Sequence, residues 1–254
     1  MARYFLSLLP AHAGAPLPEN RDHRVAAPRS VECMMDIIPP QANQAYDMRE
    51  VLRELVDEQS LFELQPDYGR SILTALCRIG GVPCMVIANQ PTVQAGAITR
   101  EAADKATHFI EVADNFGLPL VNLLDNPGVM PGPAAEKSGV LKAAGEMFRA
   151  QRRYRGRKIV VTLRKAFGFG SSVMGMNPWD GQLVNLALPC VNLGGIPAIG
   201  GAEAARASDE ESARLKEIQS GAWVPADAMA FDKVIAPADL RNEIIAALHL
   251  STSR

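Results

Sequence analysis

The stretch from Lys158 to Gly175 most narrows the folds open to this chain, because it runs directly from a strand through a turn into a helix. The β-branched run Ile159–Leu163 predicts a buried strand. Gly168 and Gly170 mark a tight turn, and the pair Ser171–Ser172 supplies side chains that cap helices. A helix that begins there presents unpaired backbone N–H groups at its positive end. The stretch therefore predicts a site that binds an anion or stabilises an oxyanion.

A tight turn without a ligand is the simplest alternative for such a stretch, and two named motifs do not fit it. A dinucleotide fingerprint needs G-x-G-x-x-G and a later acidic residue, but the third glycine is displaced to Gly175 and no acid lies near Cys190–Asn192. A nucleophile elbow needs G-x-S-x-G, but Ser171 follows Gly170 directly. We therefore expect a site of backbone amides, without a side-chain nucleophile, on a helix that ends at Pro178.

Composition excludes several functional classes. The 254 residues are 48% hydrophobic and 21% charged, with a net charge of −2, which is typical of a globular domain with one large core. The net charge does not favour a nucleic-acid partner, and no apolar run reaches the roughly 18 residues of a membrane span. The four cysteines lack a C-x-x-C pattern and the histidines are dispersed, so we expect free thiols in a reducing cytoplasm and no metal site.

Strands and helices alternate along the chain after about residue 80, which predicts an α/β fold. The expected strands are Leu61–Gln65, Ile72–Ile79, Pro83–Ala88, Leu118–Leu124, Ile159–Leu163, Leu183–Val191 and Asp232–Ile235. The expected helices are Tyr46–Asp57, Thr99–Phe116, Ser138–Tyr154, Ala202–Ala207, Glu210–Ser220 and a last one from Pro237 to Leu248. The loops Asp125–Gly132 and Gly168–Ser172 follow consecutive strands, so we expect them to face each other across one pocket.

The beginning of the chain has a different character. After a short helical stretch at residues 4–9, the segment 11–41 is rich in proline and has little periodicity. We therefore expect a linker or arm at residues 1–45, followed by one domain at residues 46–254.

Four runs of residues, in the same order along the chain, resemble the carboxyltransferase (β-type) subunits of biotin-dependent acyl-CoA carboxylases, in the style of propionyl-CoA and acetyl-CoA carboxylases. They are Ala88-Asn-Gln-Pro91, Asp125-Asn-Pro-Gly-Val-Met-Pro-Gly132, Arg164-Lys-Ala-Phe-Gly168 and Phe231-Asp-Lys-Val-Ile-Ala-Pro-Ala-Asp-Leu-Arg241. The resemblance is to the C-terminal half of such subunits, from about Asp36 onward. It implies a crotonase-like (ClpP/crotonase) fold of repeated ββα units.

The resemblance also implies a function. The chain would be the biotin-side half of an enzyme that moves a carboxyl group from carboxybiotin on a carrier protein to the α-carbon of an acyl-CoA. It would need an acyl-CoA-binding half, would work with biotin carrier and biotin carboxylase subunits, and would assemble as an oligomer. The amides of Phe169 and Gly170 would form the biotin-side oxyanion hole, with Val129 opposite. The cofactor-binding residues would be Asn89, Gln90, Gly128, Gly132, Gly168, Ser171 and Ser172.

Five positions depart from the family pattern. Where the family has Gly-Gly-Ala-Tyr-Asp, residues 168–172 are Gly-Phe-Gly-Ser-Ser, and Val129 stands where an aromatic residue is usual. A backbone donor does not depend on its side chain, so the oxyanion role is compatible with Phe169 and Ser172. The family's alanine also implies that Gly170→Ala folds and keeps most activity.

Other functions stay open at this point. One is a biotin-dependent decarboxylase that runs the transfer backwards. Another is a stand-alone crotonase-type hydrolase or isomerase, for which Asp125 and Asp180 are the nearest acids, although a turn-capping role is more common for such residues. A third is a catalytically silent half that completes an assembly.

A basic cluster spans the end of the helix Ser138–Tyr154 and the residues just after it. A solvated helix end explains it more simply than docking of an acidic partner, because cations suit a helix C-terminus. Its members are Arg149, Arg152, Arg153, Arg155, Arg157 and Lys158.

Overall fold

The computed structural model describes residues 2–12, 14–20, 22, 26–195, 208, 210–211, 214, 217 and 219–250. These residues fold around an eight-stranded sheet in the order β1-β2-β3-β4-β5-β6-β8, with β7 also paired to β5. The strands are β1 (Phe62–Leu64), β2 (Ile72–Ile79), β3 (Val82–Asn89), β4 (Leu120–Asn126), β5 (Lys158–Phe167), β6 (Val184–Ala187), β7 (Asn192–Gly194) and β8 (Lys233–Val234).

The sheet is antiparallel at one side and parallel across the rest. β1, β2 and β3 form an antiparallel meander, and every pair from β3 onward is parallel. The turn between β2 and β3 consists of Gly80 and Gly81, both with positive φ (59° and 80°), which suits a two-residue hairpin loop. The parallel strands end at one edge of the sheet, so the loops after β4 and β5 are brought together there.

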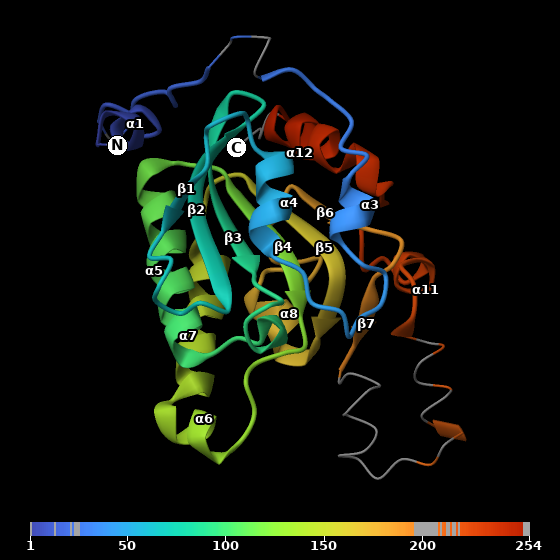
Figure 1. The fold of residues 1–254 in the computed structure, drawn as a ribbon. Helices are drawn as coiled ribbons and strands as arrows, with labels where there is room; N and C mark the ends of the chain where they lie inside the picture. The colour runs from blue at the N-terminus through green and yellow to red at the C-terminus, as the bar shows by residue number, and fades with distance from the viewer. Residues whose placement is uncertain are drawn as a thin grey trace.

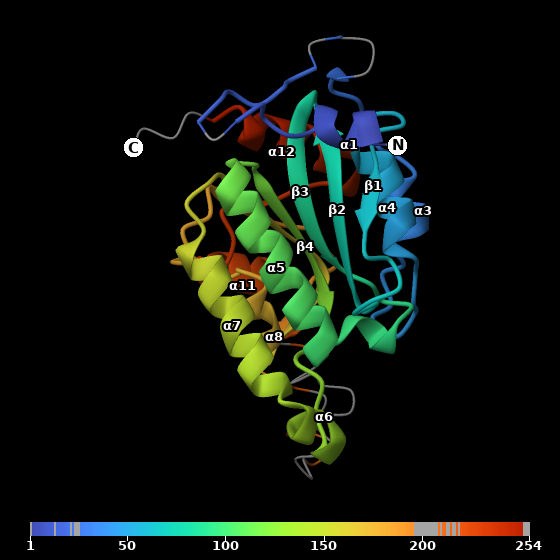
Figure 2. The same cartoon turned by 90° about the vertical axis from the view of Figure 1, so that its left-hand side faces the viewer.

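Helices cover both faces of the sheet. They are α1 (Ala2–Ser7), α3 (Met34–Ile37), α4 (Met48–Leu55), η1 (Gln94–Gly96), α5 (Arg100–Phe116), α6 (Pro133–Ser138), α7 (Val140–Arg153), α8 (Gly168–Val173), α11 (Trp223–Asp227), η2 (Pro237–Asp239) and α12 (Leu240–Leu248). Figures 1 and 2 show α5 and α7 side by side on one face, with α4 and α12 on the other.

Two hydrophobic clusters fill the spaces between the sheet and these helix layers. Val121 and Leu123 of β4 point into the cluster with α4 and α12, whereas Leu120 and Leu124 point into the cluster with α5 and α7. A parallel strand buried on both faces has a continuous apolar sequence, which is why β4 and β5 are predictable from their residues.

Most of the expected elements are confirmed. Asp47 caps α4 by accepting from the Arg49 amide, Thr99 caps α5, and Gly117 ends α5 in the left-handed conformation. The structure adds α3, α6, β7 and α11, and it extends β5 to Phe167. The expected helix Ala202–Ala207 and part of Glu210–Ser220 lie outside the described residues.

The segment before residue 46 contributes to the same core as the rest of the chain. Val31, Met34 and Ile38 are buried in the cluster under α4 and α12. The division of the chain at residue 46 stays a prediction. In the part of the chain that the structure describes, no helix is long and apolar enough to span a membrane.

Candidate functional site

The loops after β4 and β5 lie together, as the sequence predicted, and they are in direct contact; a pocket between them stays a prediction. Asn126 pairs with Ala166 where the two strands end, beyond a register shift after Leu124. A Cβ atom built on Gly170 would lie 2.6 Å from the Gly128 Cα. The two glycine-rich loops therefore share one location at the carboxyl edge of the sheet.

Hydrogen bonds fix the shape of the loop after β4. The Gly128 amide donates to the Asn126 Oδ1 atom at 3.0 Å, and Gly128 has a φ of 126°, which favours glycine. The Ile98 amide donates to the Gly128 carbonyl at 3.0 Å, and the Met130 amide donates to the Ile98 carbonyl at 2.9 Å. Val129 is half-buried between these two bonds. The loop is thus held as a short bridge to the segment before α5.

The helix after β5 begins earlier than the sequence predicted. α8 starts at Gly168, which has a φ of 54°, and its N-cap Phe167 gives no side-chain cap. The expected capping by Ser171 and Ser172 is wrong, because both residues lie inside the helix and the Ser171 hydroxyl donates to the Gly168 carbonyl at 2.8 Å. The helix also ends at Val173 rather than at Pro178.

The first turn of α8 carries the proposed donor amides. An α-helix has no intrahelical acceptor for its first N–H groups, so the amides of Phe169 and Gly170 are available to an outside acceptor. A Cβ on Gly168 would lie 2.8 Å from the Gly195 carbonyl oxygen. The turn is therefore enclosed by backbone on two sides, by the loop after β7 and by the loop after β4.

Gly170 does not have room for the methyl group that the family resemblance implied. Its φ is not positive, but the backbone Cα and C atoms of Gly128 lie at 2.6 and 2.8 Å from the position of an added Cβ. Backbone atoms cannot move aside as a flexible side chain can, so this geometry predicts that Gly170→Ala destabilises the chain, contrary to the expectation from the family resemblance.

The remaining expected residues lie around this contact. The Phe169 side chain is 39% exposed, and its ring lies 5.9 Å from that of Phe148 on α7 in a tilted arrangement. Ser172 is half-buried, and Gly132 forms the N-cap of α6. Binding of a cofactor by these residues stays a prediction.

Asn89 and Gln90 are fully buried and have partners within the chain. The Asn89 Oδ1 atom accepts from the Asp125 amide at 3.2 Å and from the Asn126 side chain at 3.1 Å. The Gln90 side chain donates to the Asp47 carboxylate at 2.7 Å and accepts from the Met48 amide at 3.0 Å. Asn89 thus shapes the loop from beneath, and Gln90 fixes the start of α4. Direct contact of either with a cofactor stays a prediction.

Sequence reasoning missed a charged cluster beneath the site. Asp125 and Arg164 are both fully buried, and the Arg164 Nε atom donates to the Asp125 Oδ2 atom at 3.0 Å. The Lys165 Nζ atom lies 3.5 Å from the Asp125 Oδ1 atom, and burial lowers the pKa of Lys165 although the carboxylate opposes that shift. Charged residues at the ends of two buried strands are the signal that could have found this cluster.

The basic cluster at the end of α7 is mostly engaged within the chain. Arg149 pairs with Glu146, Arg152 with Asp180 and Arg155 with Asp114. The Arg157 side chain donates to the Leu248 carbonyl, and the Lys158 Nζ atom donates to the carbonyls of Gln151 and Asp180.

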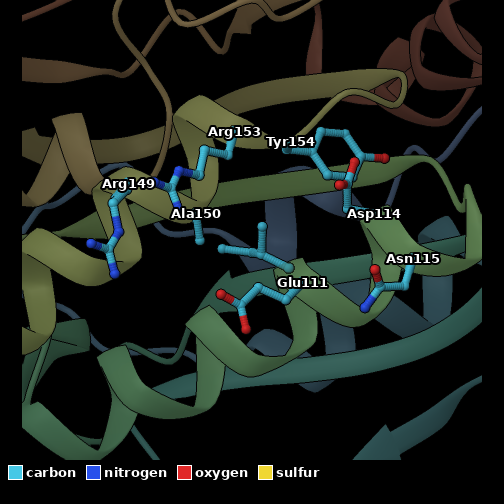
Figure 3. Close-up of a pocket in the computed structure, with 8 residues that line it drawn as sticks. Glu111, Asp114, Asn115, Arg149, Ala150, Arg153 and Tyr154 are labelled. Carbon is cyan, nitrogen blue, oxygen red and sulfur yellow. The ribbon is translucent and has the colours of Figure 1, made fainter.

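Figure 3 shows the hollow of about 280 Å³ that part of this cluster lines between α5 and α7. Its acidic and basic side chains are mixed, with Glu111 and Asp114 on α5 and Arg149 and Arg153 on α7. The hollow lies at the C-terminal ends of α5 and α7, which precede β4 and β5. It is therefore at the opposite edge of the sheet from the two glycine-rich loops. These pairs and contacts favour the solvated helix end over a docking surface.

Comparison of the chain with known proteins identifies its family. Residues 1–254 match the family described as the carboxyl transferase domain. The chain is 33% identical, over 84% of its length, to the biotin-dependent long chain acyl-coenzyme A carboxylase beta4 subunit of Mycobacterium tuberculosis, and covers 43% of that protein. It is 32% identical, over 87% of its length, to the methylmalonyl-CoA carboxyltransferase 12S subunit of Propionibacterium freudenreichii, and covers 44% of it.

A solved structure of transcarboxylase 12S, described as a hexamer assembly, superposes with a TM-score of 0.86 at 30% identity and covers 97% of this chain and 48% of that one. The chain spans about half the length of the curated relatives it matches. The crotonase-like α/β fold expected from the sequence is confirmed. The protein belongs to the carboxyl transferase family that contains the β subunits of acyl-CoA carboxylases.

Proposed function

We propose that this chain is the biotin-side half of an acyl-CoA carboxyltransferase, which moves a carboxyl group from carboxybiotin to the α-carbon of an acyl-CoA. The observation that carries the proposal is the contact between Gly170 and Gly128, which sets the first-turn amides of α8 beside the loop after β4. The names of the relatives, which include biotin-dependent acyl-CoA carboxylase subunits, support the same chemistry.

The available amides fit the group that this reaction needs. Bound carboxybiotin supplies the carboxyl group and is left with negative charge on its ureido oxygen. The amides of Phe169 and Gly170 would donate to that oxygen, with the Val129 backbone opposite. Gly128, Gly132, Gly168, Ser171 and Ser172 would line the position. Loss of one such donor costs about 3–4 kcal/mol of activation free energy.

A stand-alone hydrolase is less well supported, because both of its candidate acids are engaged. Asp125 is fully buried against Arg164. Asp180 is 3% exposed, and its carboxylate accepts from the Asn177 amide at 3.1 Å and lies 3.4 Å from the Arg152 side chain. Within the described part of the two loops, no acid is free to exchange a proton with a substrate.

The decarboxylase alternative uses the same donors. The chain is 32% identical, over 99% of its length, to the methylmalonyl-CoA decarboxylase subunit alpha of Veillonella parvula. Amides that stabilise the transition state act equally in both directions of transfer. We therefore propose one site for either direction, with the direction set by the partner subunits.

The proposal includes partners and a location. The chain spans about half the length of its relatives. We propose that it works in an oligomer with an acyl-CoA-binding carboxyltransferase half, either a separate subunit or another part of a longer chain, and with a biotin carrier and a biotin carboxylase. A catalytically silent structural half is the remaining alternative. A reducing cytoplasm is supported by the four free cysteines, of which Cys77 and Cys84 lie opposite each other on β2 and β3.

Purification of the tagged chain from its native host, followed by mass analysis of the bound proteins, tests the proposal. We expect a second crotonase-like carboxyltransferase chain and a biotinylated protein detectable with avidin. An isolated chain that hydrolyses acyl-CoA thioesters without biotin would overturn the proposal in favour of a hydrolase.

A further inference from the structure

We propose that Asp125 is the positioning residue of the oxyanion site, because its buried carboxylate joins the ends of β4 and β5, which lead to the donor amides and to the loop beside them, to two neighbouring segments. This inference rests on the proposed function for its catalytic consequence. Asp125 lies at the end of β4, directly before the loop that contacts Gly170, and its carboxylate is fully buried. It touches none of the proposed reacting atoms, so it acts through other residues.

First, Arg164 links the Asp125 carboxylate to the segment before α4. The Nε and Nη2 atoms of Arg164 each lie 3.0 Å from the Asp125 Oδ2 atom. Its Nη1 atom donates to the carbonyls of Pro39, Gln41 and Gln44 at 3.1, 2.7 and 2.7 Å. A single guanidinium thus links the carboxylate to a turn that lies 120 to 125 residues before Arg164 in the chain.

Second, Lys165 links the Asp125 carboxylate to a strained turn. The Lys165 Nζ atom is 3.5 Å from the Asp125 Oδ1 atom and 3.4 Å from the Ala95 carbonyl oxygen. Gln94 and Ala95 of η1 both have positive φ, at 50° and 55°, which costs free energy for residues other than glycine. A Cβ on the next residue, Gly96, would collide with the Asp125 carbonyl oxygen. The strained turn is therefore held directly against Asp125.

Third, hydrogen bonds of backbone amides link Asp125 to the end of β5 and to Asn89, which shapes the loop after β4. The Lys165 amide donates to the Asp125 Oδ1 atom at 3.3 Å, which fixes the ends of β4 and β5 where their register shifts. The Asp125 amide in turn donates to Asn89. Donor amides must be held within roughly 0.5 Å of their productive positions to act on a developing charge. A carboxylate that fixes both strand ends is suited to hold them there.

A second buried arginine–aspartate pair supplies a matched control. Arg241 and Asp57 are 0% and 2% exposed, with the Arg241 Nη2 atom 2.6 Å from the Asp57 Oδ1 atom. Asp57 also accepts from the amides of Gly80 and Gly81 at 2.9 and 2.7 Å, in the turn at the opposite edge of the sheet. The two pairs are alike in burial and charge, but the Asp57 pair does not reach the loops.

Hydrogen exchange of the purified chain, measured by mass spectrometry, tests the positioning role without any activity. We expect Asp125→Asn to speed exchange at least tenfold in peptides covering 126–130 and 166–170, and to speed it in 39–46. Asp57→Asn should instead speed exchange around 78–82 and leave the two site peptides unchanged. Lys165→Met keeps the Arg164 pair and should speed exchange mainly in 93–98, which keeps the test usable if Asp125→Asn folds poorly.

Kinetics of the assembled enzyme supply the second readout. Asp125→Asn should lower kcat at least tenfold with KM changed less than threefold, whereas Asp57→Asn should change kcat less than threefold at a comparable loss of Tm. Site peptides that exchange equally fast in both variants, or a kcat that follows Tm alone, would overturn the positioning role. An assembly of the wild-type chain that transfers no carboxyl group would instead overturn the proposed function and leave the exchange result standing.

Discussion

Gly170 packs directly on Gly128, with an added Cβ at position 170 only 2.6 Å from the Gly128 Cα atom. This contact joins the first turn of α8 to the loop after β4 and brings the two glycine-rich segments of the sequence into one site. The close approach leaves no space for a larger residue at position 170.

Gly170→Ala should disturb the site because the new methyl group meets backbone. We expect a loss of about 1–3 kcal/mol in the free energy of unfolding, together with a large loss of carboxyl transfer. Gly145→Ala is the control, because Gly145 lies within α7 and nothing lies within 4 Å of an added Cβ. That variant should gain up to about 1 kcal/mol. A Gly170→Ala protein with wild-type stability would show that the two loops do not pack this closely.

Ser171→Ala and Ser172→Ala should leave transfer largely intact, because the proposed donors are backbone amides. Ser171→Ala loses the hydrogen bond to the Gly168 carbonyl, which is worth about 1 kcal/mol. We expect kcat to fall by no more than about tenfold in either variant. Rates of transfer from carboxybiotin, with Tm as a control for folding, check this. A folded variant with kcat lower by several orders of magnitude would point to a serine nucleophile instead.

Phe169→Ala separates the role of the amide from that of the side chain. The variant keeps the N–H group and removes the ring that contacts Phe148 on α7. We expect transfer to persist within about tenfold, because the backbone donor is kept. Phe148→Ala serves as the comparison, since it removes the same ring contact from the other side. If Phe169→Ala abolishes transfer in a folded protein, the side chain itself takes part in the reaction.

Stability should depend on pH through Lys158. Burial lowers the pKa of this lysine from 10.5 to about 8. Between these values the unfolded chain keeps a proton that the folded chain has lost, so the free energy of unfolding rises with pH. Relative to Lys158→Met, the wild-type chain should gain about 1 kcal/mol between pH 8 and pH 9.

The difference between the wild-type chain and Lys158→Met isolates the effect of the lysine, because the buried cysteine thiols change the stability with pH in the opposite direction. Burial raises the pKa of Cys84 from 9.0 to about 12, so the unfolded chain loses its proton first and stability falls above pH 9. Urea unfolding of both proteins at the two pH values gives the difference. Parallel pH profiles would show that Lys158 titrates normally in the folded chain.

Local signals explain why much of the fold is predictable. The helix α5 is recognisable from its apolar stripe and from Thr99 and Gly117, which act within one turn of their own position. The helices α6 and α11 escape prediction because six and five residues give too little periodicity to detect. The two site loops are identifiable because they follow consecutive buried strands.

The missed features of the site depend on contacts between distant residues. The close approach of Gly170 to Gly128 could not be predicted from the sequence, because Gly128 follows another strand and no local pattern reports that distance. The pairing of Arg164 with Asp125 joins residues 39 positions apart. Ser171 and Ser172 have good capping side chains, but the positive φ of Gly168 allows the helix to begin before them.

Transfer of an isotope-labelled carboxyl group from a carboxylated biotin carrier to an acyl-CoA is the most direct test of the central claim. The purified chain should be measured alone and again with the carboxyltransferase chain that co-purifies with it. We predict no transfer by the chain alone and labelled carboxyacyl-CoA from the combination. Full transfer by the isolated chain, or none by an intact assembly that holds both halves, would contradict the assignment of this chain as a biotin-side half.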